Sequence, residues 1–383
     1  MNIRPQLESL RQFIEREILK GYDPYDALNS PMLRALSFGQ KAARIAFIQF
    51  LKRLPVNPRP LLGIKKDYNP KGLGLFLWGY VKLFKIERKP EYLEKIDEFL
   101  NLLAKTISRN YTGNGWGYNF DWQSRAFYIP KYTPTVVNSS FIGHALLDAY
   151  EYTGNEKAFK MADPIKDFIL NDLNRIGEDG ALCFSYTPLD HYFVHNANLL
   201  GSSLLIRLYG FSKEAKLKET ALSSLTYSMR HQREDGSWYY AEKESAHWID
   251  SFHTAFNLQA IKYFLDLGFA EVYRGQFEKG VRFYAQNFFL EDGTPKYYPN
   301  RIYPIDIHAP TQAIVFFSKM GGPYKALTDK ILEWMLQNMQ DKNGGFFYFQ
   351  KHRFYTNKIP YMRWGQAWAF HALTEYYNSM FQN

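Results

Sequence analysis

The sequence contains a single cysteine, Cys183, among its 383 residues. One cysteine cannot form a disulfide within the chain, and it excludes a zinc site built from several cysteines. Long apolar runs are also absent, since no stretch approaches the ~18 apolar residues that are needed to cross a bilayer. The first 21 residues are charged and amphipathic, without the apolar segment of a secretory signal. From these absences we expect a soluble, cytoplasmic protein with no transmembrane segment.

Several motifs that carry known chemistry are missing as well. The sequence has no P-loop, no G-x-G-x-x-G after a strand, no H-E-x-x-H and no nucleophile elbow. We therefore expect no cofactor and no metal centre. Metal binding through oxygen ligands alone is left open by the sequence.

Positive charge is only moderately in excess over negative charge. Lysine and arginine number 47 and aspartate and glutamate 38, which gives a net charge of +9. Such an excess suits an anionic partner, such as a uronate-containing glycan, a phosphate, a membrane surface or a nucleic acid. The basic residues are scattered and form no block of the kind that binds nucleic acid, so we predict no nucleic-acid partner. An ordinary solvated basic surface is the alternative.

Aromatic residues are abundant, with 31 Phe, 29 Tyr and 8 Trp. Together with 46% hydrophobic and 22% charged residues, they indicate a well-packed globular protein. Tyr and Trp in such numbers suit both a core and surfaces that stack against sugar rings or polyprenyl chains.

Five glycine-aromatic turns form a weak repeat. Their glycines are Gly115, Gly180, Gly236, Gly293 and Gly344, with spacings of 65, 56, 57 and 51 residues. A unit of this size holds two helices and a long loop. Short β signals are confined to these turns, at residues 238–240 and 346–349.

The segments between the turns alternate in character. Apolar stretches rich in small residues cover 136–150, 196–209, 249–264, 307–319 and 364–377. More charged amphipathic segments follow most of them, at 156–173, 213–230 and 273–288. A helix that is apolar all round is buried, whereas one with a single apolar stripe lies outside. The pattern predicts inner and outer helices of a closed ring, with further hairpins from 33–54, 72–84 and 91–108. We expect one domain over 1–383, with N-terminal hairpins in 1–110 and the five repeats in 111–383.

Two of the turns resemble a known repeat. Gln232, Gly236 and Trp238 fit the Q-x3-G-x-W core of the repeat in squalene and terpenoid cyclases, and residues 340–346 are a copy with Phe346 in place of Trp. Over roughly residues 110–380 the chain thus resembles the α/α-toroid superfamily. That superfamily includes prenyltransferases, terpenoid cyclases, uronyl hydrolases, polysaccharide lyases and glucuronyl C5-epimerases. The resemblance implies an all-α fold, a single (α/α)6-7 toroid with short β-turn loops at one end, but a fold does not fix a function.

The likeness to cyclases is confined to the scaffold. The D-x-D-D acid motif of class II cyclases is not matched, because residues 303–308 offer one aspartate, and the D-D-x-x-D motif of class I enzymes is absent. The cysteine-containing zinc site of protein prenyltransferases and lanthionine cyclases has no counterpart in a chain with one cysteine.

In toroids the cleft is lined by the loops that lead into the inner helices. Here those loops are 118–123, 191–198, 247–254, 303–308 and 360–366, and each combines an ionisable group with aromatic or amide side chains. The recurrence of this combination at equivalent repeat positions predicts a functional cleft.

The sharpest candidate is the pair Asp250 and His253, which share a helix face at i and i+3. A carboxylate that orients an imidazole is a common way to hold a general base. The alternative is an N-cap aspartate with a core histidine. Asp306 and His308 occupy the equivalent place one repeat later, with a turn aspartate and a helix-start histidine as the alternative.

Other candidates complete the predicted site. Asp121 lies between aromatic residues that would favour its protonated form, so it is a candidate general acid. Tyr361 is a candidate acid–base group opposite His253, and Arg363 could bind a carboxylate. Predicted substrate-binding residues are Trp116, Tyr118, Trp122, Asn138, Asn198, Trp248, Gln312 and Trp364. Each of these could instead be structural.

The leading hypothesis is therefore an enzyme that acts on a uronate-containing glycan in the toroid cleft. His253 and Tyr361 would move a proton next to the carboxylate held by Arg363, as in an epimerase or a lyase, while Asp121 assists at the glycosidic oxygen. Hydrolysis by Asp121 with Asp250 or Asp306 is the close variant. The alternatives are a non-catalytic glycan-binding protein and a terpenoid or prenyl-type enzyme.

Overall fold

The computed structural model describes residues 1–124 and 127–381 and consists mainly of helices. The helices are α1 (Arg4–Arg16), α2 (Pro31–Leu36), α3 (Lys41–Arg53), α4 (Pro70–Glu87), α5 (Pro90–Lys105), α6 (Val136–Thr153), α7 (Glu156–Ala162), α8 (Ile165–Asp167), α9 (His195–Ser212), α10 (Ala215–Arg230), α11 (Ser251–Asp266), α12 (Arg274–Asn287), α13 (His308–Met320), α14 (Lys325–Met339) and α15 (Trp368–Ser379). A π-helical segment, Met362–Ala367, leads into α15, and another covers Phe168–Asp172.

Six helices form a closed inner ring. Helix α4 packs against α6, and the contacts continue through α9, α11, α13 and α15 back to α4. These helices are buried on nearly all sides, as their small and apolar residues predict. An outer helix pairs with each of them, namely α5, α7, α10, α12, α14 and α1. The fold is an all-α toroid of six inner and six outer helices, as the sequence predicts.

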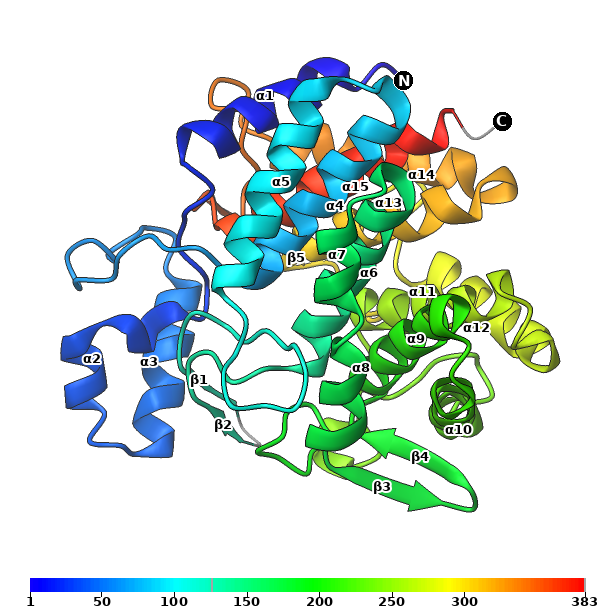
Figure 1. The fold of residues 1–383 in the computed structure, drawn as a ribbon. Helices are drawn as coiled ribbons and strands as arrows, with labels where there is room; N and C mark the ends of the chain where they lie inside the picture. Colours follow the sequence, from blue (N-terminus) through cyan, green and yellow to red (C-terminus); the bar gives the residue numbers. More distant parts are fainter. Residues whose placement is uncertain (125–126, 382–383) are drawn as a thin grey trace.

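The two glutamines of the sequence repeat join each turn to the next outer helix. Gln232 donates to the carbonyls of Gly236 and of Gln276 in α12, and Gln340 donates to those of Gly345 and of Gln6 in α1. Gly345 has a positive φ, and a Cβ there would lie 2.3 Å from Ser9 Oγ of α1. The first helix of the chain therefore closes the ring against the last turn. In Figure 1 both chain termini lie at the top of the molecule, and α1 contacts α15.

The N-terminal region differs from its prediction. Residues 33–54 were expected to add a hairpin to the ring, but α2 and α3 project from it (Figure 1). They pack on a separate small core that includes Leu33, Ile48 and Leu51. The predicted outer helix 156–173 is interrupted, since α7 ends at Ala162, two residues before Pro164. Proline lacks an N–H and its ring clashes with the preceding turn, which explains the break.

The strands are short and lie in the loops. They are β1 (Trp122–Gln123), β2 (Tyr128–Ile129), β3 (Arg175–Glu178), β4 (Ala181–Phe184), β5 (Ile305–Asp306), β6 (Gln350–Lys351) and β7 (Thr356–Asn357). Antiparallel pairs join β1 to β2 and β3 to β4, and β5, β6 and β7 form a three-stranded sheet. The β signals expected at 238–240 and 346–349 do not become strands, and the second of them makes a single β-bridge, between Phe347 and Gln340.

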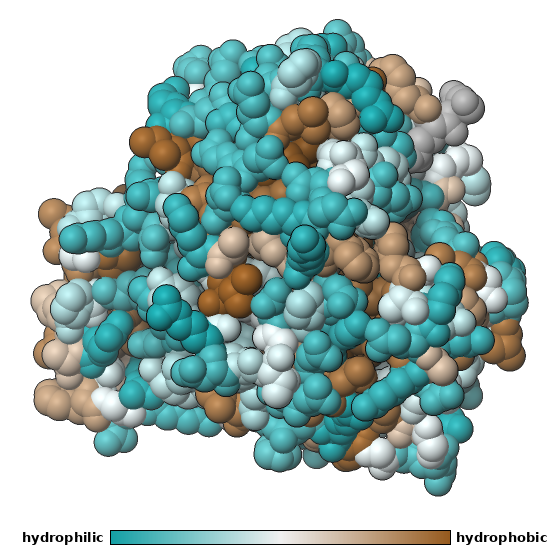
Figure 2. Space-filling view, viewed as in Figure 1, coloured by the Kyte–Doolittle hydropathy of each residue, from teal (hydrophilic) through white to brown (hydrophobic). Residues whose placement is uncertain are grey.

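No helix within residues 1–124 and 127–381 combines the length and the apolar character that crossing a bilayer needs. The face of the molecule in Figure 2 is largely hydrophilic, with apolar residues scattered over it in small groups.

Candidate active site

All six inner helices begin at one pocket. The first turns of α4, α6, α9, α11 and α13 and the π-helical segment before α15 each contribute lining residues, and the cavity has a volume of about 270 Å³. The lining residues are Tyr25, Lys71, Tyr118, Phe120, Trp122, Val137, Tyr186, Asn196, Tyr240, Trp248, Asp250, Phe252, His253, Phe256, Tyr297, Tyr298, His308, Arg363 and Trp364. Because an N-terminus carries the positive end of a helix dipole, six such ends favour negative charge in this pocket.

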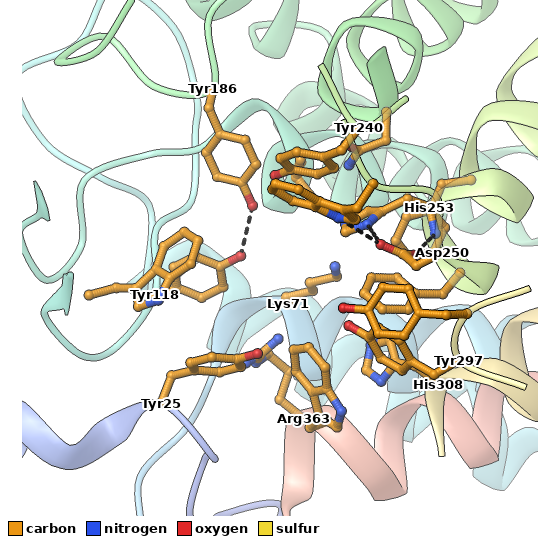
Figure 3. Close-up of a pocket in the computed structure, with 18 of the residues that line it drawn as sticks. Tyr25, Lys71, Tyr118, Tyr186, Tyr240, Asp250, His253, Tyr297, His308 and Arg363 are labelled. Carbon is orange, nitrogen blue, oxygen red and sulfur yellow. Dashed lines mark hydrogen bonds and ion pairs between the residues drawn. The ribbon is translucent and has the colours of Figure 1, made fainter. Parts of the chain in front are cut away.

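Asp250 and His253 form the pair that the sequence predicts. Asp250 Oδ2 lies 2.7 Å from His253 Nδ1, while Oδ1 accepts from the backbone N–H of His253 at 3.0 Å (Figure 3). Asp250 is thus both the N-cap of α11 and the partner of the imidazole. This bond leaves Nε2 of His253 without a protein partner among the described residues, and the side chain is 22% exposed. A carboxylate in this position holds the imidazole in one tautomer, as a general base requires.

His308 lies on the next inner helix and is almost fully buried. Burial lowers the pKa of His308 well below its usual value, and the nearby cationic groups Lys71 and Arg363 act in the same direction. Its Nδ1 lies 3.7 Å from Asp306 Oδ1 and has no hydrogen-bond partner in the described part of the chain. The ring of His308 packs on that of Trp364, with centroids 4.0 Å apart. The pocket therefore holds two imidazoles from different helices, and His308 is neutral.

Asp306 supports this wall from behind the pocket. Its carboxylate accepts hydrogen bonds from the backbone N–H of His308 at 3.0 Å, from Trp364 Nε1 at 2.8 Å and from Gln350 Nε2 at 2.7 Å. Burial raises the pKa of Asp306. Asp306 does not line the cavity, so its geometry is that of a residue that positions His308 and Trp364.

Arg363 lines the pocket but is already bound to a carboxylate. Its Nε and Nη2 donate to the two oxygens of Asp23 at 2.6 and 2.7 Å, and both side chains are almost fully buried. The pairing brings the loop that contains Asp23 and Tyr25 to the mouth of the ring, and the tilted rings of Tyr25 and Trp364 pack with centroids 5.2 Å apart. The bidentate geometry that was expected for a substrate carboxylate is therefore taken by Asp23.

Tyr361 and Asp121 do not line the pocket. The Tyr361 hydroxyl is buried without a hydrogen-bond partner in the described structure, and the Arg59 guanidinium lies 4.8 Å above its ring. Burial raises the pKa of Tyr361. Asp121 accepts from the backbone N–H of Lys131 and lies 3.6 Å from Arg34. The structure thus places neither residue where it could act as predicted.

Four of the predicted substrate-binding residues also lie outside the cavity. Trp116 Nε1 donates to the Leu103 carbonyl within the core, and Asn198 bonds to Phe184, Ser224 and Ser228. Gln312 donates to Gln259, and Asn138 is buried with both amide atoms unpartnered among the described residues. Tyr118, Trp122, Trp248 and Trp364 do line the cavity, as predicted.

Lys71 is the main residue of the pocket that sequence reasoning missed. It is the second residue of α4, whereas the inner helix was expected to begin at Gly72. The available signal was Asn69-Pro70, an N-cap residue followed by a proline at the first helical position. Several tyrosines were missed too, including Tyr186, whose hydroxyl lies 3.1 Å from that of Tyr118. No cluster of three or more His, Cys, Asp and Glu side chains suited to a metal ion occurs in the described residues.

Comparison with solved structures identifies the fold. The chain is similar to the cellobiose 2-epimerase of Spirochaeta thermophila, with 13% identity, a TM-score of 0.62, and coverage of 100% of this chain and 99% of that one. The cellobiose 2-epimerase of Bacillus thermoamylovorans has 14% identity and a TM-score of 0.63, covering 82% and 90%. A GH76 α-mannanase of Bacteroides thetaiotaomicron has 12% identity and a TM-score of 0.62, covering 83% and 88%. No protein-family model matches the sequence, and the curated proteins searched contain no match. At these identities the likeness establishes the α/α-toroid fold.

Proposed function

We propose that this protein is a carbohydrate epimerase that moves a proton at the carbon next to the carbonyl group of a reducing sugar. The observation that carries the proposal is the presence of two imidazoles in one small aromatic pocket, with His253 bound to Asp250 at 2.7 Å. Epimerisation requires a base on one face of a carbon atom and an acid on the other. His253 and His308 come from adjacent helices and supply these two groups.

The electrostatics of the pocket favour the same chemistry. Removal of the proton leaves negative charge on the carbonyl oxygen, and catalysis depends on dipoles that are already aimed at such charge. Six helix N-termini point their N–H groups toward the cavity. Burial favours the neutral form of His308, in which one ring nitrogen can take up a proton from solvent before the ring passes it to the sugar.

Hydrolysis has less support from the pocket. The two-carboxylate mechanism needs a pair of carboxyl groups that flank the glycosidic bond. Asp250 is the one carboxylate among the lining residues, and it is bonded to His253. Asp121 and Asp306, which were expected to provide the second carboxylate, do not line the cavity.

The size and lining of the pocket bear on the substrate. A cavity of about 270 Å³ is at the lower end of small-molecule sites and suits one or two sugar units. Trp122, Trp248 and Trp364 offer faces for stacking. The epimerases of similar fold act, by their names, at C2 of cellobiose, a neutral disaccharide. The acidic substrate expected from the net charge is less favoured, because Arg363 is already paired with Asp23.

The remaining alternatives fit the lining less well. A terpenoid or prenyl-type cavity should be almost wholly aromatic and aliphatic, whereas this pocket contains Lys71, Asp250, His253, His308 and Arg363. A glycan-binding protein needs aromatic platforms but no carboxylate–imidazole pair.

The experiment is incubation in heavy water with D-glucose, D-mannose, cellobiose, mannobiose and uronate oligosaccharides, followed by NMR and mass spectrometry. We expect the C2 epimer of a neutral reducing sugar, with deuterium at C2, and a loss of about 10²–10⁴-fold in His253→Asn. His247→Asn is the matched control, because His247 stacks on Tyr239 and does not line the pocket. Unsaturated uronate products would identify a lyase instead, and binding without exchange or cleavage would indicate a glycan-binding protein.

A further inference from the structure

Lys71 places an amine at the centre of the pocket. The side chain belongs to the first turn of α4, where Asn69 Oδ1 accepts from the backbone N–H groups of Lys71 and Gly72 at 3.1 and 3.3 Å. Asn69 is itself held by a 2.7 Å hydrogen bond to Asn119 Oδ1. In Figure 3 the amine of Lys71 points into the cavity, between His253 and His308. The residue is 4% exposed, so its backbone and its stem are fixed while the amine faces the cavity.

The amine has no anionic partner within the described residues. Among the described residues, the hydrogen bond of Lys71 to a side chain is made by its backbone N–H, and the contacts of its amine are with aromatic rings. Its neighbours are the rings of Phe141 at 4.4 Å, Trp368 at 5.3 Å and Phe256 at 5.6 Å. Arg363, the other basic side chain among the lining residues, does have an oxygen partner, in Asp23.

These surroundings disfavour the ammonium form. Burial lowers the pKa of Lys71 well below its usual value, the positive charge of Arg363 lowers it further, and Asp23 opposes this effect. The dipoles of the surrounding helix N-termini also disfavour a cation. The three rings attract a cation by roughly 0.5–2 kcal/mol, which is the smaller effect in a fully desolvated position. A lysine that is desolvated and adjacent to another cationic group is the kind that acts as a nucleophile toward carbonyl compounds.

Resting on the proposed epimerase function, we infer that Lys71 forms an imine with C1 of the open-chain sugar and thereby acidifies the hydrogen at C2. The lone pair of Nζ attacks the C1 carbonyl carbon, and the carbinolamine takes up one proton and loses one water to give an iminium ion. His253 removes the C2 proton, and the electron pair of that C–H bond forms a C1=C2 enamine while the nitrogen becomes neutral.

The second half of the cycle reverses these steps on the other face. A proton from solvent, relayed through the imidazole of His308, is delivered to C2 on that side and regenerates the iminium ion with inverted configuration, while His253 returns its proton to solvent. Water then adds to C1 and the amine leaves, with release of the proton taken up earlier. One water is lost and one regained, so the sequence needs no other reactant.

The test is trapping of the iminium ion with sodium cyanoborohydride. The protein is incubated with cellobiose, D-glucose or D-mannose and the reductant, and its peptides are analysed by mass spectrometry. We expect a reduced sugar adduct on Lys71, formed in proportion to loss of activity and in excess over adducts on exposed lysines. Lys82 is the internal control, because it is a buried lysine of the same helix that is paired with Glu375 at 2.8 Å.

Two substitutions separate a covalent role from an electrostatic one. Lys71→Arg retains a positive charge but cannot form an imine, and Lys71→Met has neither property. We expect both to lose at least about 100-fold in epimerisation, with unchanged thermal unfolding in Lys71→Arg. Lys82→Arg should keep the Lys71 adduct.

The outcomes distinguish the two proposals. Epimerisation without an adduct on Lys71, or near-normal turnover by Lys71→Arg, overturns the imine and leaves the epimerase function standing. Absence of both deuterium exchange and trapping with every sugar overturns the epimerase function, and the imine with it.

Discussion

At the scale of single residues, Asp250 performs two tasks that sequence reasoning treated as alternatives. One oxygen caps α11 by accepting from the backbone N–H of His253, and the other binds His253 Nδ1. Trp248 Nε1 also donates to that second oxygen, at 3.2 Å. The cap fixes where the helix begins, and the same carboxylate fixes the tautomer of the first histidine in it. In the proposed mechanism, stability and catalysis therefore depend on different oxygens of one side chain.

Two substitutions of Asp250 separate these tasks. Asparagine is as good an N-cap as aspartate, so Asp250→Asn should unfold within a few tenths of a kcal/mol of the wild type while losing about 10²–10⁴-fold in epimerisation. Asp250→Ala should lose both activity and about 1 kcal/mol of stability. Urea unfolding and the epimerisation rate measure the two effects. Wild-type turnover by Asp250→Asn would show that the carboxylate charge has no part in the chemistry.

At the same scale, the sequence alone could not determine which residues of the loops face the pocket. The loops that lead into the inner helices were correctly expected to converge, but a helix turns by about 100° per residue, and loop geometry decides which residue of the first turn faces the axis. Arg363 and Trp364 face the cavity while Tyr361 faces away from it. The partner of Arg363, Asp23, lies 340 residues away in sequence, so no local pattern could identify it.

At the scale of the helices, the inner ring depends on close approach at glycines. Gly79 of α4 faces α15, where an added Cβ would lie 2.4 Å from Phe370 Cε1. Gly74 of α4 faces Ile142 of α6, and Gly143 of α6 faces Leu204 of α9, with similarly short distances. The small residues that made these stretches recognisable as buried helices thus set the spacing of the ring. For this reason the apolar, small-residue composition of these stretches located the inner helices to within a few residues.

A pair of glycine substitutions tests this packing. Alanine is favoured over glycine in a helix by about 1 kcal/mol, yet Gly79→Ala should lower the free energy of unfolding by roughly 1–3 kcal/mol because the added methyl overpacks against Phe370. Gly210→Ala in α9 is the matched control, since nothing lies within 4 Å of its Cβ position. It should raise stability by about 0.5–1 kcal/mol. Equal effects in the two variants, measured by urea unfolding, would contradict the account.

At the scale of the whole molecule, the ring has an electrical polarity. The N-termini of the six inner helices meet at the active-site pocket, and their C-termini meet at the opposite end. Cationic side chains gather at that opposite end, where they face the negative ends of the helix dipoles. They include Lys82 paired with Glu375 and Arg207 paired with Asp148. Cations and carboxylates are paired at that end, whereas the pocket at the other end keeps the positive potential of six helix N-termini.

This buried polarity makes stability dependent on pH. Burial lowers the pKa of five histidines, and four of them, His144, His195, His308 and His371, are almost fully buried. In the unfolded chain they titrate near 6.5, so below that pH unfolding takes up protons that the folded state does not hold. The contribution of these histidines to the free energy of unfolding should therefore be fully present above about pH 7. It should fall as the pH decreases, by up to about 1.4 kcal/mol per pH unit for each histidine.

The measurement is urea unfolding between pH 5.5 and 7.5. His371→Asn removes one of the four groups. It should reduce the slope of the unfolding free energy against pH by up to about 1.4 kcal/mol per pH unit, which corresponds to one proton, whatever its effect on absolute stability. Burial also raises the pKa of Asp26 to about 6 and the pKa of Asp190 and Asp306 above the usual value, so these three carboxyl groups oppose the trend of the histidines toward pH 5.5. A free energy of unfolding that stays constant or rises toward pH 5.5 would contradict the neutral state of these histidines.

The central claim is that His253 and His308 act on opposite faces of one carbon atom. Its most direct test is the exchange of the C2 hydrogen with heavy water in His253→Asn and His308→Asn, using D-glucose and D-mannose or cellobiose and its C2 epimer as separate substrates. Each variant should lose epimerisation but keep exchange for one configuration of the sugar, and the two variants should keep opposite configurations. Exchange that is lost or kept equally for both epimers in both variants would contradict the claim.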